Sequence, residues 1–531
     1  MNRRNFVKAA GAGALSVAQG SAVAGRAEPG GSARSGGTAP QVVFVMTDTT
    51  RWDMLNCYRN TGLKTPNLDR LASQGVRFER AYTCQPVCGP ARSALFTGTW
   101  PHTNGMWGNS MSLGTVWRTV GQRLQDRGVH TGYIGKWHLD GADYFGTGRC
   151  PPGWDKSYWY DGQDYLEELS EKDRVRSRTT ATNRDPALKE DFLYAHRCSN
   201  RAIDFLSKHN TETFFLAVSY DEPHGPFLCP RPYSEMYRDY VFPGSRNLQD
   251  SLASKPEHQR VWAGPRYSER PAARPIREPD YFGCHTYVDY EIGRVLDAID
   301  KYAPGALVIY TSDHGDFLDA HQLSGKGPAS YDEIARIPFM VRWPGRVPKA
   351  AVCPHPISHI DVVPTILDVM GMPAVKPLEG KSMLGAFIDP KVRPNEAVFM
   401  EWGRYEIDHD GFGGFQPLRA ALDGRYKLTV NLLTSDELYD LQTDPAEMVN
   451  LIGSSEHAAI RNALHDRIIE HMHQTRDPFR GYYWGRRPWR PDYPAAWAGL
   501  GMTRQREDDG YEPRQLVYET GLEMKDAVRK K

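Results

Sequence analysis

The stretch Gln41-Val42-Val43-Phe44-Val45-Met46-Thr47-Asp48 decides the fold. The run from Gln41 to Met46 is almost wholly apolar, which is typical of a strand buried on both faces of a parallel sheet. Two polar residues, Thr47 and Asp48, follow it directly. In open α/β sheets, ligands bind in the crevice outside the carboxyl ends of the strands. Asp48 is therefore a candidate site residue.

Three further short apolar runs end in the same way, in side chains that carry chemistry. One such ending would be uninformative, but four in one chain predict a single shared site, because carboxyl ends of parallel strands meet at one edge of a sheet. The other runs and their endings are 131–135 with Lys136 and His138, 214–220 with His224, and 307–310 with Asp313 and His314.

Helical patterns alternate with these strands. Caps, helix-starting Pro and helix-ending Gly mark several of them, and a further strand is predicted at 337–341. We interpret 146–180 as a long excursion over the active-site face and 228–279 as loop-rich. This order predicts an α/β fold with a large mixed, mostly parallel sheet between helices. The predicted helices are 65–74, 119–127, 191–208, 287–301 and 364–370.

The pattern changes after about Pro390. Strands at 397–402 and 426–430 and one amphipathic helix at 457–473 predict a smaller α+β subdomain. The predicted domains are thus 1–40, 41–390 and 391–531. The segment 477–497 interleaves arginines with aromatic residues, which could stack on a sugar or on nucleic acid. We favour an arm that packs against the body of the protein.

Composition excludes several classes of protein. The 531 residues include 65 basic and 65 acidic side chains, so no global charge favours nucleic acid or an anionic membrane as a partner. The eight cysteines are scattered, with no CxxC and no zinc-ribbon spacing. Length and composition are those of a loop-rich globular enzyme.

The N-terminus has the features of an export signal. Residues 2–8 contain the pair Arg3-Arg4, followed by a weakly apolar run at 9–18 and a small-residue cleavage site at Ala22-Val23-Ala24. We interpret 1–40 as a twin-arginine signal peptide and linker, and we expect a periplasmic or secreted protein. No other apolar run is long enough to span a bilayer, so we expect no stable membrane insertion.

The stretch Cys84-Gln85-Pro86-Val87-Cys88-Gly89-Pro90-Ala91-Arg92-Ser93-Ala94-Leu95-Phe96-Thr97-Gly98 reads as a loop that becomes a helix. Pro90 suits a first helical position and Gly98 a C-terminal stop. Cys88 then lies just ahead of a helix N-terminus, where unpaired N–H groups favour an anion. Arg92 adds a positive charge one turn later. For a lone cysteine, a structural role is the usual alternative.

At this point the motifs resemble a known family. Cys88-Gly89-Pro90-Ala91-Arg92 resembles the C-x-P-x-R signature of type I sulfatases, and 135–139 resembles their second signature. The resemblance extends through 311–316, 359–365 and 438–441, and looks nearest to uncharacterised bacterial sulfatases. It implies an alkaline-phosphatase-like fold and the hydrolysis of a sulfate ester.

The resemblance also implies a mechanism. In the family, the cysteine at the position of Cys88 is oxidised to formylglycine, whose hydrate attacks sulfur, releases the alcohol and then expels sulfate. Arg92 would hold this group, and Lys136 and Lys326 would contact the sulfate oxygens. His138 would be the base for sulfate elimination, and His224 would protonate the leaving alcohol.

A divalent metal is implied as well. Asp48, Asp313 and His314 would bind it together with residue 88. Mostly oxygen ligands favour Ca²⁺, while the imidazole leaves Mn²⁺ or Mg²⁺ open. Thr49 stands where many members have a second Asp, and His314 where many have Asn. These departures bear on the metal and its coordination number.

The expected substrate is a sulfated glycan, another small alcohol sulfate or an aryl sulfate. His321, Arg404 and His409 are candidates for binding it. A formylglycine-generating enzyme and the twin-arginine translocase would be transient partners, and no nucleic acid is expected. The alternatives are a phosphonate monoester or phosphodiester hydrolase on the same scaffold, and a non-catalytic sulfated-glycan binder in which Cys88 stays a thiol.

Overall fold

The computed structural model describes residues 40–141, 144–264, 275–373, 376–493, 518 and 520–522. They belong to one compact unit, which spans residues 39–531. The predicted signal peptide and linker lie outside the described residues, apart from Pro40, as does the end of the 477–497 segment. Within the described part of the chain, no helix is both long and apolar enough to cross a membrane.

A large sheet carries the strands that the sequence predicted. In space the described strands follow the order β4-β3-β5-β1-β6-β8-β2-β7, with β9 beside β2. The five strands from β4 to β6 are parallel, and β8 runs antiparallel to β6. The strands are β1 (Gln41–Thr47), β2 (Val76–Tyr82), β3 (His130–Gly135), β4 (Trp159–Tyr160), β5 (Phe214–Ser219), β6 (Leu307–Ser312), β7 (Arg336–Ile337), β8 (Phe339–Arg342) and β9 (Ala351–Ser358).

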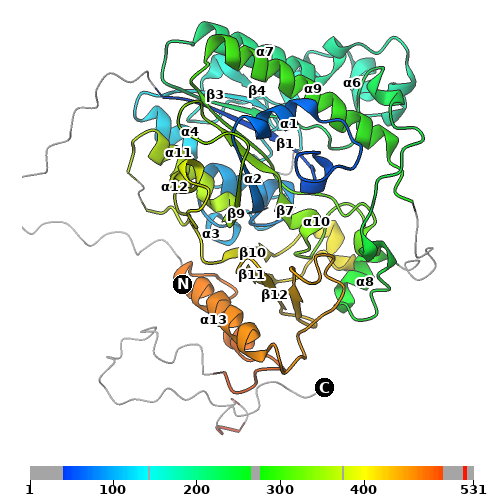
Figure 1. Cartoon of the computed structure of the whole chain (residues 1–531), viewed down its shortest axis with the longest axis vertical. Coiled ribbons are helices and arrows are strands. Elements are labelled where there is room, and N and C mark those ends of the chain that lie inside the picture. The colour runs from blue at the N-terminus through cyan, green and yellow to red at the C-terminus, as the bar shows by residue number, and fades with distance from the viewer. Residues whose placement is uncertain are drawn as a thin grey trace, which may run out of the picture. The chain divides into compact units, whose positions relative to one another are not determined.

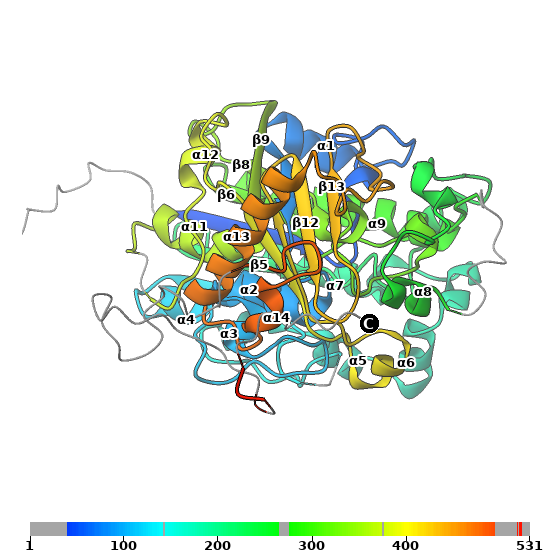
Figure 2. The same ribbon diagram turned by 90° about the horizontal axis from the view of Figure 1, so that it is seen from below.

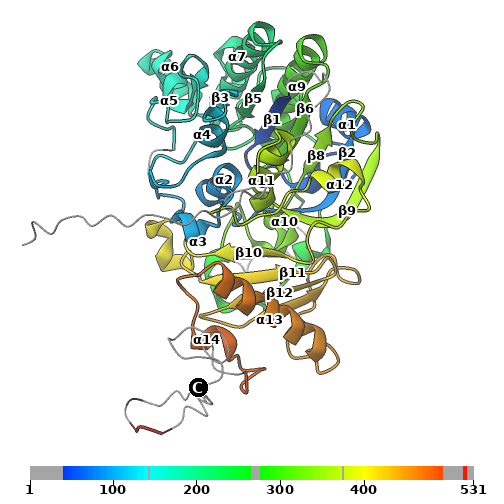
Figure 3. The same ribbon diagram turned by 90° about the vertical axis from the view of Figure 1, so that its left-hand side faces the viewer.

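Helices cover both faces of this sheet (Figure 3). Alternate residues of β1 explain why, since Val43 and Val45 pack under α1, α7 and α9, while Val42 and Phe44 pack under α2, α4 and α11. The predicted α/β fold is therefore confirmed. These helices are α1 (Pro66–Ser73), α2 (Cys88–Thr97), α4 (Val120–Gln125), α7 (Tyr194–Lys208), α9 (Pro279–Tyr302) and α11 (Val362–Val369).

A second, antiparallel sheet follows residue 390 (Figure 1). The helix α13 (Ala458–Gln474) lies across one face of it (Figure 2), with Leu464 and Ile468 packed on Leu428 and Val430. The amide of Glu401 donates to the Cys84 carbonyl, which ties this sheet to the first. The domain boundary near 390 stays a prediction. The strands are β10 (Val398–Trp402), β11 (Leu418–Leu422), β12 (Tyr426–Asn431) and β13 (Glu437–Asp440).

The structure corrects several predicted elements. The helix α2 begins at Cys88, so Pro90 is its third residue rather than its first. The α-helices α5 and α6 lie in the segment predicted as an excursion, and α8 lies in the segment predicted as loop-rich. The helix α9 begins at Pro279, two turns before the predicted start. The remaining helices are α3 (Pro101–Asn104), α5 (Gly162–Glu167), α6 (Glu171–Ser177), α8 (Glu257–Ala263), α10 (Asp332–Ala335), α12 (Leu384–Ile388) and α14 (Tyr482–Gly485).

Candidate active site

Four neighbouring strands deliver the site. In the spatial order β3-β5-β1-β6, Lys136 follows β3, Asp221 follows β5, Asp48 follows β1 and Asp313 follows β6. The strands are parallel, so these residues meet at one edge. All four residues are buried. The strand endings that the sequence singled out are brought together here.

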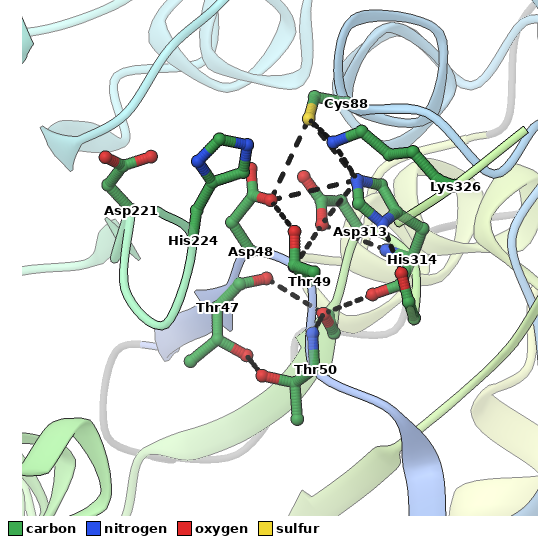
Figure 4. A network of polar contacts seen from close by, with 12 residues as sticks. Thr47, Asp48, Thr49, Thr50, Cys88, Asp221, His224, Asp313, His314 and Lys326 are labelled. Carbon is green, nitrogen blue, oxygen red and sulfur yellow. Dashed lines mark hydrogen bonds and ion pairs between the residues drawn. The ribbon is translucent and has the colours of Figure 1, made fainter. Parts of the chain in front are cut away.

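Cys88 lies at the first turn of α2 and points into this edge (Figure 4). Its Sγ is 2.8 Å from the Nζ of Lys326 and 3.3 Å from the Nε2 of His314. Burial and the Asp48 carboxylate raise the pKa of the Cys88 thiol, but Lys326, Lys136 and His314 outweigh them and lower this pKa to about 5. The pocket therefore favours an anion at position 88.

Arg92 is fully buried one turn later and links two strand ends. Its Nη2 donates to Asp48 Oδ2 at 3.1 Å and its Nε to Asp313 Oδ2 at 3.0 Å. Its Nη1 donates to the Lys136 carbonyl and to Ser219 Oγ. Every arm of the guanidinium is thus committed to orienting the strand ends of the site.

Four side chains converge on one point where a cation would fit. Ligand atoms of Asp48, Cys88, Asp313 and His314 all lie within 4.8 Å of one another. The Nδ1 of His314 faces the Gly315 carbonyl at 2.8 Å and donates to it, which leaves Nε2 as the lone-pair atom on the cluster side. Two carboxylates and an imidazole are a donor set that suits a divalent metal.

Thr49 orients both carboxylates of this cluster. Its hydroxyl donates to Asp48 Oδ1 at 2.5 Å, and its amide donates to Asp313 Oδ1 at 3.1 Å. To do so it adopts a left-handed φ of 59°. A non-glycine residue in this conformation is strained, and such strain gathers at functional sites. Thr49 thus positions the carboxylates of both Asp48 and Asp313.

A hydrogen-bonded chain runs from Lys136 to His224. The Lys136 ammonium is 2.7 Å from Asp48 Oδ2 and 3.0 Å from Asp221 Oδ1. The hydroxyl of Tyr144 donates to Asp221, accepts from Lys136 at 2.8 Å and lies 2.9 Å from the Nδ1 of His224. The ends of β3 and β5 pack closely at Gly135, the residue before Lys136. A Cβ at Gly135 would lie 1.9 Å from the Ser219 carbonyl oxygen.

The two histidines are neutral in this environment. Burial and Lys136 lower the pKa of His224 to about 4, and they lower that of His138 to about 3. His224 directs Nδ1 to the Gly225 carbonyl at 3.1 Å, so Nε2 is left for a ligand. His138 adopts a φ of 58°, and its buried Nδ1 has no partner among the described residues. Both rings are therefore available for proton transfer.

Asn109 connects the loop after β10 to the helix α2 by hydrogen bonds. Asn109 Oδ1 accepts from the Gly89 amide at 2.9 Å, and its Nδ2 donates to Glu406 at 3.1 Å. Within this loop Arg404 pairs with Asp410 and His409 lies 2.9 Å from Asp408. Arg404 and His409 therefore belong to a loop that is tied to the site.

His321 does not reach the cluster. It is completely buried, its Nδ1 lies 2.7 Å from Asp250 Oδ2 and its Nε2 lies 3.3 Å from Asn247. Its ring stacks on Tyr331 with a centroid distance of 4.0 Å. Because the side chain has no exposed surface, a substrate cannot touch it in this arrangement. We therefore leave His321 out of the proposal below.

Sequence reasoning did not single out Tyr144, Asp221 and Asn109. Asp221 follows a predicted strand directly, so the strand-end argument could have found it. Tyr144 and Asn109 lie in loops with no periodic pattern, and nothing in the sequence marks them. Their place in the site follows from tertiary contacts alone.

Comparisons with known proteins identify a family. Residues 40–372 match the family described as Sulfatase, and residues 327–474 match one described as N-sulphoglucosamine sulphohydrolase, C-terminal. The chain is 45% identical to the uncharacterized sulfatase YidJ of Escherichia coli, over 91% of this chain and 97% of that protein. It is 25% identical to an N-acetylglucosamine-6-O-sulfatase of Bacteroides thetaiotaomicron, over 82% and 87%.

Solved structures show the same fold. One neighbour is a complex with its substrate D-glucosamine-2-N,6-O-disulfate, with a TM-score of 0.67, 21% identity and coverage of 83% of this chain and 99% of that one. Another is the phosphonate monoester hydrolase of Agrobacterium radiobacter, with a TM-score of 0.67, 22% identity and coverage of 82% and 96%. At these identities the likeness concerns the fold alone.

Proposed function

This chain belongs to the sulfatase family and is a sulfuric ester hydrolase, and we propose that it releases sulfate from a sulfated sugar or another small alcohol. Its fold is the alkaline phosphatase-like α/β fold, as the sequence predicted. Membership of the family generally implies a divalent metal and a formylglycine. The roles of individual residues below are our proposal.

One observation carries the proposal. The buried Cys88 lies among Asp48, Asp313 and His314 and is flanked by the Lys326 ammonium. Lys136 and Arg92 add two further buried cations at the same edge. Buried cations next to the candidate nucleophile suit the oxygens of a sulfate ester, whose charge is redistributed in the transition state.

The side chains around position 88 suit both a formylglycine and a divalent cation. Formylglycine at position 88 would supply, as its hydrate, the oxygen nucleophile. A divalent cation, for which we favour Ca²⁺ over Mn²⁺ or Mg²⁺, would be held by Asp48, Asp313, His314 and residue 88 and would supply charge neutralisation. Thr49 and Arg92 hold the two carboxylates in place for it.

The remaining residues bind the ester and move protons. Lys136 and Lys326 bind the sulfate oxygens. His224 donates a proton from Nε2 to the leaving alcohol oxygen. A bound sulfate ester adds negative charge beside Lys136, which offsets the effect that lowers the pKa of His224. His138 then takes a proton from the remaining hydroxyl of the residue 88 hydrate as sulfate is expelled.

The substrate class follows from the relatives and from the loop at the site. One relative is named for 6-O-sulfated N-acetylglucosamine, and one structural neighbour holds a sulfated glucosamine. The aromatic rings of Trp107 and Phe415 stack on Arg404 in the loop beside Asn109, where a sugar ring could also pack. We propose a sulfated monosaccharide or glycan end as the substrate, with Arg404 and His409 in its binding site.

Peptide mass spectrometry combined with an activity assay tests the proposal. Protein made together with a formylglycine-generating enzyme should show the aldehyde at position 88 and release sulfate from 4-nitrophenyl sulfate and from sulfated monosaccharides. Cys88→Ala should release none. Faster turnover of 4-nitrophenyl phosphate or a phenyl phosphonate than of the matched sulfate would instead favour the phosphonate or phosphodiester hydrolase. Native-host protein in which Cys88 is always an unmodified thiol, and which binds sulfated sugars without turnover, would favour the binder.

We further propose export by the twin-arginine route, supported by Arg3-Arg4 and Ala22-Val23-Ala24. Replacing both arginines by lysine should retain the protein in the cytoplasm, and fractionation followed by immunoblotting measures this. Unchanged export of the lysine variant would contradict the proposal.

A further inference from the structure

A cavity lies beside the candidate general acid and shares residues with the candidate active site. Its lining includes Lys136 and His224 together with Tyr144, Tyr165 and Tyr194. It therefore begins where the alcohol part of a sulfate ester would leave the sulfate-binding residues. The segment from 144 to 194, which supplies most of its wall, includes the excursion predicted to cover this face.

Two oxygen atoms in the wall of this cavity have no partner. Glu222 is 8% exposed, and its Oε1 accepts from the amide of Ala195 in the first turn of α7 at 3.0 Å, whereas its Oε2 has no partner among the described residues. Tyr194 is also 8% exposed, and its hydroxyl is likewise without a described partner.

Such atoms are rare and costly. Buried polar side-chain atoms are nearly always hydrogen-bonded, because burying one without a partner forfeits its hydrogen bonds to water. The neighbouring Tyr165 follows the rule, since its hydroxyl donates to the Phe192 carbonyl at 3.0 Å. Two of the residues that line this cavity, Glu222 and Tyr194, thus each keep an unused hydrogen-bonding atom.

The charges around the cavity favour an uncharged ligand. Burial and the Asp221 carboxylate raise the pKa of Glu222 to about 8, so this carboxyl is protonated at neutral pH and has a proton to donate. Lys136 and Arg178, two cations in the wall, disfavour a positively charged ligand. Asp221, whose carboxyl stays ionised because Lys136 lowers its pKa, disfavours a second negative charge. Arg178 also lies over the Phe145 ring, with its Cζ 4.8 Å from the centroid.

We propose that this cavity binds an uncharged, hydroxyl-bearing part of the leaving alcohol, with Glu222 and Tyr194 as its hydrogen-bonding partners. Glu222 donates from Oε2, and the Tyr194 hydroxyl donates or accepts. The tyrosine rings pack against the apolar faces of the alcohol. This inference rests on the proposed function and adds the residues that select the alcohol.

Two variants test the assignment. Tyr194→Phe removes one unpartnered oxygen and keeps the ring. Glu222→Gln keeps an acceptor for the Ala195 amide. For each, kcat/KM is measured with 4-nitrophenyl sulfate, which carries no hydroxyl, and with a panel of sulfated monosaccharides. The ratio of sugar to aryl kcat/KM should fall at least tenfold in both variants.

The matched control is Tyr160→Phe. Tyr160 is in ring contact with Tyr194, but its hydroxyl donates to Glu168 and it does not line the cavity. Its substitution should change the ratio less than twofold. Thermal unfolding gives a second readout, because Tyr194→Phe should melt at the same temperature as the wild type or higher, since it removes an unsatisfied buried group.

The outcomes separate this inference from the proposed function. No turnover of any sulfate ester by the modified wild type would overturn the proposed function itself. Turnover of the aryl ester but of no hydroxyl-bearing ester would overturn only the cavity assignment. An equal loss for both ester classes in the two variants would show a structural role and would overturn it too. Once a preferred sugar is found, its deoxy analogues should identify one hydroxyl whose removal abolishes the effect of Tyr194→Phe.

Discussion

Asn109 accepts a hydrogen bond from the amide of Gly89, the residue after the candidate nucleophile, at 2.9 Å. Through its Nδ2 the same side chain holds Glu406 in the loop after β10. The start of α2 and the candidate substrate loop are therefore positioned by one amide group.

Asn109→Ala should lower kcat/KM for sulfate esters by roughly ten- to a hundredfold, because it releases both contacts and leaves the Gly89 amide unpaired. Asn109→Asp keeps the acceptor for Gly89 but loses the donor to Glu406. It should therefore raise KM for a sugar sulfate more than it lowers kcat. Steady-state kinetics of the two variants measures this, and identical profiles would contradict the separate roles.

Arg92 should tolerate no substitution. Arg92→Ala leaves Asp48 and Asp313 without their buried guanidinium partner, which for a broken buried ion pair costs about 3–5 kcal/mol of folding free energy. Arg92→Lys keeps the positive charge but loses the planar guanidinium that bonds Asp48 and Asp313 through two different nitrogens. It should lower kcat by roughly a hundredfold. Urea denaturation and single-turnover assays measure the two effects. The exposed Arg238→Lys serves as the control and should match the wild type.

Removal of the metal should abolish turnover and lower the melting temperature. A ligand at a hundred times its Kd stabilises the folded state by about 2.7 kcal/mol. Chelator-treated protein is titrated with Ca²⁺, Mg²⁺ and Mn²⁺ while the melting temperature and sulfate release are followed. We expect Ca²⁺ to restore both, and we expect Asp313→Asn to show neither response. Full activity in the chelator would contradict the proposed site.

Tyr144→Phe should lower kcat about tenfold with little change in KM. The lost hydroxyl joins Lys136, Asp221 and His224 Nδ1, so its removal disturbs the proposed acid more than it disturbs binding. The comparison variant is Tyr165→Phe, whose hydroxyl donates to a main-chain carbonyl away from these charges. A loss confined to KM would assign Tyr144 to binding instead.

Glu222 should make stability depend on pH. Its pKa is raised to about 8 in the folded protein by burial and by Asp221, against about 4.3 in an unfolded chain. Between these values the folded state holds a proton that the unfolded state releases. The free energy of unfolding therefore falls as pH rises, by up to about 1.4 kcal/mol per pH unit.

Glu222→Gln should remove this slope. The difference in urea denaturation free energy between variant and wild type should grow in favour of the variant from about pH 5 to about pH 8 and then level off. Glu235→Gln, at the surface, is the control and should run parallel to the wild type. Parallel curves for Glu222→Gln would contradict the raised pKa.

The sequence predicted the strands that hold the site because their surroundings constrain them strongly. A parallel strand covered on both faces must be apolar throughout, so a polar residue at its end stands out, as Asp48 does after Met46. Strands with one polar face leave a weaker pattern. In β2, Arg77 and Glu79 alternate with buried residues, and β9 carries Pro354 and Pro356, which its position at the outer edge of the sheet permits.

The loop residues could not be predicted for a different reason. Tyr144 and Asn109 act through contacts with residues that are distant in the chain, and such contacts leave no local period or motif. His321 shows the converse. It was a candidate for binding the substrate, but its ring contacts Asp250 and Tyr331 in the core.

The hydrogen bond between the Glu401 amide and the Cys84 carbonyl sets an order of events during synthesis. The loop before Cys88 contacts the strand β10, and their bonded residues, Cys84 and Glu401, are 317 positions apart in the chain. At about 5–20 residues per second, the ribosome needs roughly 15 to 60 s to make that stretch. Cys88, only 1% exposed in the finished protein, lacks the cover of β10 until that strand has been made.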